Sequence, residues 1–158
     1  MKILFFLATC LAAAGALAAE ANNVTYPDGY RGWHHVKSME LKPGHPLYES
    51  FGGLHHIYAN PKAVKGYRTG KFSDGAVIVF DLLEARSEGN AMTEGKRKVL
   101  GVMVRDKRRF AETGGWGFEG FAGGDPKQPV VGGNAAQDCF GCHAPQKESN
   151  YLFSTLRE

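Results

Sequence analysis

The sequence has few cysteines and almost no excess of charge of one sign. Three of its 158 residues are cysteine, and 19 Lys and Arg residues against 16 Asp and Glu residues leave a formal net charge of +3. Three cysteines are too few for the disulfide framework of a small secreted scaffold. The basic residues are spread among acidic ones and form no stripe interleaved with aromatic side chains, so we expect no nucleic acid partner.

Long apolar runs are also missing. The longest, Ile3–Leu17, has about 15 residues, whereas a membrane-spanning helix needs about 20. It follows the positively charged start Met1-Lys2 and ends in a stretch of small residues through Ala19. This pattern predicts a secretory signal peptide over residues 1–19 and a mature domain over residues 20–158.

Export to the periplasm, without a membrane span, is therefore the expected location. An alternative is a lipoprotein acylated at Cys10. It fits less well, because Cys10 comes early for such a site and Thr9 stands where a smaller residue is expected.

The mature chain shows no repeat, and its short elements are separated by Gly, Pro and Asn. Asn60 and Pro61 are typical of a helix start, and Gly70 of a helix end. Runs of β-branched and aromatic residues with alternating polarity predict strands. The expected strands are 54–58, 76–83, 99–104 and 116–121, and the expected helices are 61–69, 106–112 and a turn or two within 134–143. This pattern predicts a single α+β domain with an antiparallel β-sheet and a few short helices.

The segment Cys139-Phe140-Gly141-Cys142-His143 carries the clearest chemistry. Without the signal peptide, Cys139 and Cys142 are the only cysteines, and His143 follows directly. Cys-x-x-Cys-His attaches a c-type haem: the two sulfurs reach two vinyl groups on one haem edge, and the histidine turns under the iron. We predict one covalently attached haem c, with His143 as the metal ligand. The alternative is a redox disulfide.

A sixth ligand is harder to find. Met39, Met92 and Met103 are available; Met103 lies in an expected strand and Met92 in a polar, glycine-containing segment expected to be a loop. The histidines form two neighbouring pairs, His34-His35 and His55-His56. Adjacent residues of a strand point to opposite faces, so at most one of each pair can face a haem.

Three stretches resemble the cytochrome P460 family: TGKFSDGAVIVFDL (69–82), FAETGGWGFEGF (110–121) and CFGCH (139–143). Their order and spacing carry the resemblance, which spans roughly Tyr26 to His143. In the hydroxylamine-oxidising members of that family a lysine of the first stretch is cross-linked to the porphyrin. The matching residue here is Phe80, which has no nitrogen to form that bond.

Phe80 makes the chain resemble the cytochrome c′-β branch, in which two phenylalanines cap the distal side of the haem. The resemblance implies that Phe80 and Phe51 form this cap, that the haem is five-coordinate, and that the protein is a homodimer that binds nitric oxide or carbon monoxide. A pocket of two aromatic rings offers no hydrogen bond to a ligand, and no general acid or base is evident in it.

Two other functions stay open. One is an enzyme that oxidises hydroxylamine, against which Phe80 argues. The other is an electron carrier with a redox partner protein, against which the lack of a convincing axial methionine argues.

Overall fold

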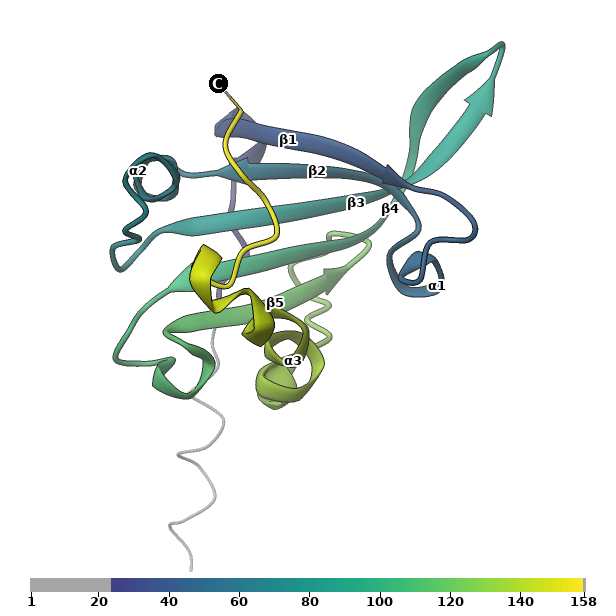
Figure 1. Cartoon of the computed structure of the whole chain (residues 1–158). Coiled ribbons are helices and arrows are strands. Elements are labelled where there is room, and N and C mark those ends of the chain that lie inside the picture. The colour runs from purple at the N-terminus through teal and green to yellow at the C-terminus, as the bar shows by residue number, and fades with distance from the viewer. Residues whose placement is uncertain (1–23, 158) are drawn as a thin grey trace, which may run out of the picture.

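The computed structural model describes residues 24–157, and its fold is built on one antiparallel β-sheet (Figure 1). The predicted signal peptide, 1–19, lies outside the described residues. Five strands pair in the order β1-β2-β3-β4-β5, so each lies beside its neighbour in the chain. The strands are β1 His34–Leu41, β2 Gly53–Ala59, β3 Val77–Glu88, β4 Ala91–Arg105 and β5 Trp116–Ala122, and the α-helices are α1 Tyr48–Phe51, α2 Pro61–Thr69 and α3 Gly141–His143. The predicted α+β class is confirmed.

Local signals placed α2 correctly. The Asn60 side chain accepts a hydrogen bond from the Ala63 amide at 2.9 Å, Pro61 occupies the first turn, and Gly70 ends the helix with φ 69°. An asparagine cap satisfies an amide that has no partner within the helix, and glycine adopts positive φ without steric cost.

Two elements differ from the expectation. β1 was not predicted, because a bulge between His35 and Lys37 interrupts its alternation. The helix expected over 106–112 is wrong: only a 3-10 turn, Ala111–Thr113, forms there. The Asp106 carboxylate does accept from the amides of Arg108 and Arg109, but Phe110 has φ −116° and ψ 38°, which stops a helix from continuing.

β3 and β4 are much longer than predicted and form an arm that projects beyond the rest of the sheet (Figure 1). β2 pairs with β3 only as far as Leu83, and β5 pairs with β4 only from Val99, whereas β3 and β4 stay paired to their tip. The tip is a two-residue turn, Gly89-Asn90, with φ of 57° and 61°. Met92 therefore lies in a strand and not in a loop, and it is 42% exposed.

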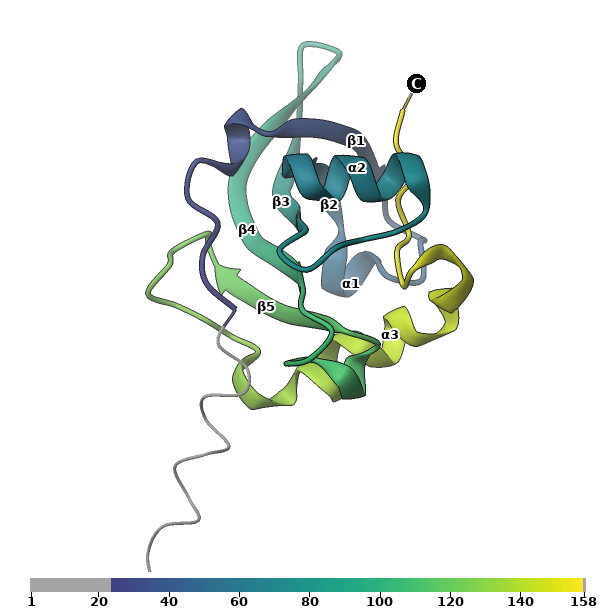
Figure 2. The same cartoon turned by 90° about the vertical axis from the view of Figure 1, so that its left-hand side faces the viewer.

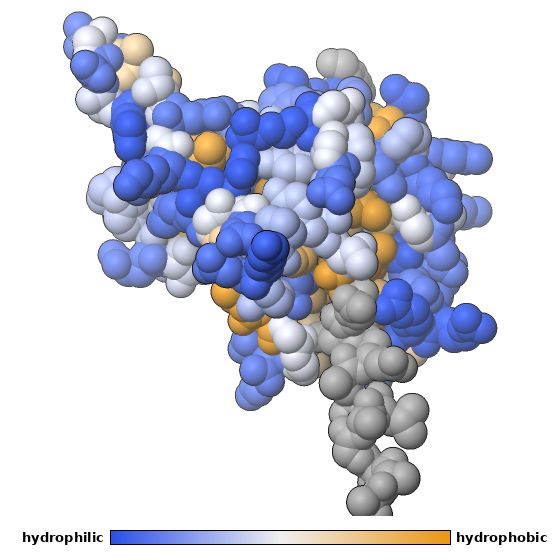
Figure 3. Space-filling model, turned by 180° about the vertical axis from the view of Figure 1, so that it is seen from behind, coloured by the Kyte–Doolittle hydropathy of each residue, from blue (hydrophilic) through white to orange (hydrophobic). Residues whose placement is uncertain are grey.

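The two faces of the sheet are covered by different parts of the chain (Figure 2). We call the side covered by α1, α2, α3 and residues 144–157 the helical face. Its core includes Ile78, Trp116 and Phe118. The opposite face packs against residues 24–33, and its core includes Val79 and Leu100. Seen from behind, the surface is largely hydrophilic with scattered apolar patches (Figure 3). Among residues 24–157 no helix is long and apolar enough to cross a membrane.

Candidate functional site

Cys139, Cys142 and His143 project from one helical segment on the helical face. Residues 136–140 form a wide π-helical turn that continues into α3. Residues three and four positions apart lie on the same side of a helix, so the two thiols and the imidazole share one side. Both cysteines are free; Cys139 is partly buried and Cys142 is exposed. The predicted spacing thus places the three donors on one side of this segment.

His143 is held in one tautomer. Its Nδ1 lies 2.7 Å from the carbonyl oxygen of Tyr151, and a carbonyl only accepts, so Nδ1 carries the proton. Burial lowers the pKa of His143, which keeps the ring neutral. Phe118 and Phe153 flank the ring, each with its centroid 5.0 Å away. Nε2 is then a free lone-pair donor, which is the form of histidine that binds a metal.

An unusual turn supplies the carbonyl that holds His143. Asn150 and Tyr151 both have positive φ, 56° and 65°, a conformation that is uncommon for residues other than glycine. The Tyr151 amide donates to the Gln146 carbonyl at 2.7 Å, and its ring packs against Phe140 at 5.3 Å. The turn folds the chain back so that the Tyr151 carbonyl faces the imidazole.

Glu119 anchors the chain just before the cysteine segment, and sequence reasoning did not identify it. Its side chain is buried on β5 and accepts hydrogen bonds from the amides of Val131 at 2.8 Å, Gly132 at 3.1 Å and Gly120 at 2.9 Å. A buried carboxylate is stable where several N–H groups donate to it. The only signal in the sequence is a charge between Phe118 and Phe121 in an otherwise apolar strand.

Phe80 and Phe51, predicted to act together, do lie together. Their ring centroids are 6.0 Å apart and the planes meet at 86°, an edge-to-face pair. Phe80 is two positions after Ile78 on β3, so both side chains lie on the same face of the sheet. Ile78 belongs to the core of the helical face, from which the His143 segment projects. The Phe80 ring lies over Gly101 of β4, where an added Cβ would come within 3.3 Å of it.

A histidine also lies beside this pair, which corrects the expectation that no acid or base is near. His55 is 3% exposed, and its ring centroid is 4.7 Å from that of Phe80. Its Nε2 lies 2.5 Å from the Phe51 carbonyl oxygen, so Nε2 donates there. Burial lowers the pKa of His55.

Comparison with known families identifies the chain. The model of the cytochrome P460 family matches residues 27–154, which include both phenylalanines and the complete Cys-x-x-Cys-His segment. This chain belongs to the cytochrome P460 family. No curated protein matches it.

Membership of the cytochrome P460 family implies a haem as cofactor, and the residues present fit one. The donor set is two thiols and one neutral imidazole, and no cluster of three or more His, Cys, Asp or Glu residues suited to a metal ion exists among residues 24–157. A single protein ligand would suit an iron that a porphyrin already coordinates. Phe51 and Phe153 leave 39% and 62% of their surfaces exposed beside the site, and a flat apolar cofactor would cover such rings.

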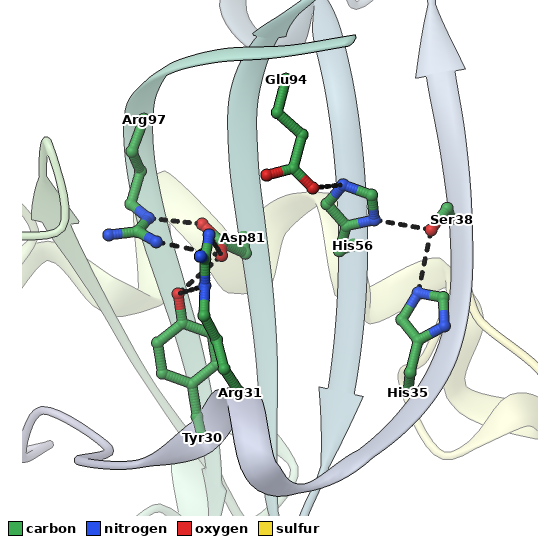
Figure 4. Close-up of polar contacts among 8 residues, drawn as sticks. All are labelled: Tyr30, Arg31, His35, Ser38, His56, Asp81, Glu94 and Arg97. Carbon is green, nitrogen blue, oxygen red and sulfur yellow. Dashed lines mark hydrogen bonds and ion pairs between the residues drawn. The ribbon is translucent and has the colours of Figure 1, made fainter.

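His56, the neighbour of His55 on β2 of this cytochrome, points to the face of the sheet opposite the helical face, because adjacent residues of a strand point to opposite sides (Figure 4). There Ser38 Oγ lies 2.6 Å from His56 Nδ1 and 2.8 Å from His35 Nε2. His56 Nε2 lies 2.9 Å from the Glu94 carboxylate, although without the alignment of a hydrogen bond. The bulge in β1 is what places His35 and Ser38 on one side.

Asp81 forms the other polar cluster of that face (Figure 4). Its carboxylate is fully buried, accepts from Arg97 Nε at 2.6 Å and from the Tyr30 hydroxyl at 2.6 Å, and lies 3.2 Å from Arg31. Asp81 follows Phe80 in the chain, so this cluster fixes β3 from behind while Phe80 faces the site.

Proposed function

We propose that this chain is a mono-haem c-type cytochrome of the periplasm that binds nitric oxide or carbon monoxide. Cys139 and Cys142 would hold the haem through thioether bonds, His143 would ligate its iron from one side, and Phe80 and Phe51 would cap the other. The pairing of Phe80 with Phe51, on the face from which His143 projects, is the observation that carries the proposal.

The cysteines support covalent attachment over a redox disulfide. Burial, with Asp138 nearby, raises the pKa of the Cys139 thiol to about 11. Dithiol oxidoreductases work in the opposite way, because their attacking cysteine needs a lowered pKa to form a thiolate. Cys139 therefore suits a permanent thioether better than reversible exchange.

The bound haem iron would supply a coordination position for a diatomic gas. The side chains of Phe80 and Phe51 would determine which ligands are favoured at that position. Two aromatic rings exclude water and provide no donor for a ligand that carries charge on its outer atom, so neutral nitric oxide and carbon monoxide are favoured over dioxygen and anions. His55 does not supply that donor, because its Nε2 is engaged by the Phe51 carbonyl.

The alternative from the same family is a hydroxylamine-oxidising enzyme with a lysine cross-linked to the porphyrin. Position 80 holds Phe, which cannot form the link. A ferrous absorption spectrum separates the candidates: a Soret band strongly shifted to long wavelength would favour the enzyme, and a six-coordinate low-spin spectrum would favour an electron carrier.

The β3–β4 arm supports the homodimer that we also propose. An isolated two-stranded hairpin is only marginally stable in water, and beyond Leu83 no other strand of residues 24–157 pairs with this one. A second copy is the occupant we propose for it. Sedimentation of the mature protein tests this, and a monomer at micromolar concentration would contradict it.

Flash photolysis of the carbon monoxide complex tests the proposed function itself. Phe80→Ala should speed rebinding and let water or anions reach the ferric iron, and it should cost about 3 kcal/mol of stability through the cavity it leaves. Extraction of the denatured protein with acid acetone should leave the haem bound to the chain, because thioether bonds survive this treatment. Equal rebinding rates in wild type and Phe80→Ala would refute the role of Phe80 in the cap. Free extraction of the haem would refute its covalent attachment.

A further inference from the structure

His55 connects the two phenylalanines of the proposed cap. Its imidazole contacts the backbone of Phe51 through the 2.5 Å hydrogen bond and the ring of Phe80 through an edge-to-face contact at 4.7 Å and 78°. It is 3% exposed, so water does not compete for its Nε2. A single buried side chain therefore contacts both phenylalanines.

Apart from its contacts with His55 and Phe80, Phe51 is held by local backbone bonds, from its own amide to the Leu47 carbonyl at 2.9 Å and from the Gly52 amide to the Tyr48 carbonyl at 2.6 Å. It ends α1, a helix of four residues, and helices this short have almost no stability of their own. Gly52 and Gly53 follow, and Gly53 has φ 127°. Besides His55, a second side chain holds this junction: Lys98 Nζ donates to the Gly52 carbonyl at 2.8 Å.

The other side of the cap is rigid. Phe80 lies in the middle of β3, paired with Ile57 of β2 and with Gly101 of β4. The ring that can move is therefore that of Phe51, which is 39% exposed, while the Phe80 ring stays over Gly101.

We infer that His55 is a positioning residue that holds Phe51 against Phe80 and so controls how readily a gas passes between the two rings. The inference rests on the proposed gas-binding function. The His55 hydrogen bond keeps the end of α1 closed over the Phe80 ring. Without it the last turn of α1, which precedes the fixed strand residue Gly53, moves away from Phe80 and opens the way to the iron.

The test compares carbon monoxide association after flash photolysis in matched variants of the holoprotein. His55→Leu keeps an apolar side chain of similar length but donates nothing, and it should raise the association rate roughly two- to tenfold, the factor that corresponds to one net hydrogen bond. His55→Gln retains an N–H donor and should stay near wild type. Lys98→Met, which frees the Gly52 carbonyl and lies on the surface side of the junction, should give a smaller increase.

A matched control removes the same kind of bond elsewhere. Thr113 Oγ1 donates to the Trp116 carbonyl at 2.6 Å in another buried turn. Thr113→Val should lower stability but leave the association rate unchanged. If it speeds association as much as His55→Leu, the effect is general loosening and the inference is wrong.

A double variant shows whether His55 acts through Phe51. In a Phe51→Ala background His55→Leu should have no further effect on the rate. A persisting effect would mean that His55 acts through Phe80 or as an acid or base, and it would overturn the inference. Wild-type protein that fails to bind carbon monoxide would refute the proposed function, whereas normal binding with equal rates in His55→Leu would refute only the role of His55.

Discussion

His143 donates from Nδ1 to the carbonyl oxygen of Tyr151, a residue that the chain holds at a φ of 65°. The donor and the acceptor are eight residues apart, and the turn between them closes only because Asn150 and Tyr151 both adopt the left-handed conformation. The imidazole orientation of the proposed iron ligand thus depends on backbone geometry at Tyr151.

Two substitutions at Tyr151 separate this backbone effect from the loss of the ring. Both Tyr151→Gly and Tyr151→Val remove the aromatic contact with Phe140, but glycine accepts positive φ whereas valine, being β-branched, resists it. We expect Val to be about 1–2 kcal/mol less stable than Gly in thermal unfolding. The iron–histidine stretching band in resonance Raman spectra should shift in Val and stay near wild type in Gly; equal bands in both would contradict the dependence.

Glu119 should contribute substantially to stability, because it holds the chain just before the cysteine segment through hydrogen bonds to backbone amides. Glu119→Ala leaves the amides of Gly120, Val131 and Gly132 without their carboxylate. We expect a loss of about 2–4 kcal/mol in urea unfolding, because hydrogen bonds to a charged acceptor contribute more than neutral ones. Glu119→Gln, which keeps one oxygen acceptor, should lose less than half as much. Similar losses in both variants would contradict this, because they would show that the remaining amide oxygen contributes nothing without the charge and the second oxygen of the carboxylate.

Asp81→Asn should destabilise the fold from the face opposite the site. The carboxylate is fully buried between Arg97 and the Tyr30 hydroxyl, and removing one partner of a buried ion pair typically costs about 3–5 kcal/mol. Because Arg31 and Arg97 retain partial contact with water, we expect the lower end of that range in chemical unfolding. Glu84→Gln is the control: its ion pair with Arg86 is exposed, and its loss should change stability by less than about 1 kcal/mol.

His55 predicts how stability changes with pH. Burial holds its pKa in the folded protein below the usual histidine value of about 6.5, so the unfolded chain binds a proton that the folded protein does not. Stability should therefore fall as pH drops below about 6.5 and level off once the folded-state pKa is passed. His55→Gln should flatten this slope in unfolding curves between about pH 7 and 5. An unchanged slope would assign the dependence to His35 and His143, the partly buried histidines whose pKa burial also lowers.

Features that depend on neighbouring residues could be predicted from the sequence. The Asn60 cap and Gly70 stop define α2, and alternation put Ile78 and Phe80 on one face of β3. The spacing of Cys139, Cys142 and His143 places three donors on one side of a helical turn, since that depends only on the helical period. Phe80 was predicted to cap the haem because it occupies, within the family-like stretch 69–82, the position where the hydroxylamine-oxidising members have a lysine.

Tertiary structure decided the features that join distant parts of the chain. Three features depend on strand register and on how loops return to the sheet. They are the β1 bulge, the contact of His55 with both phenylalanines, and the hydrogen bonds from the amides of residues 131–132 to Glu119. Period and propensity carry no information on register across long separations, because a shift of one residue exchanges the two faces of a strand without altering its own pattern. The residues of the proposed chemistry could therefore be named from local sequence, whereas the residues that hold them in position could be named only from the fold.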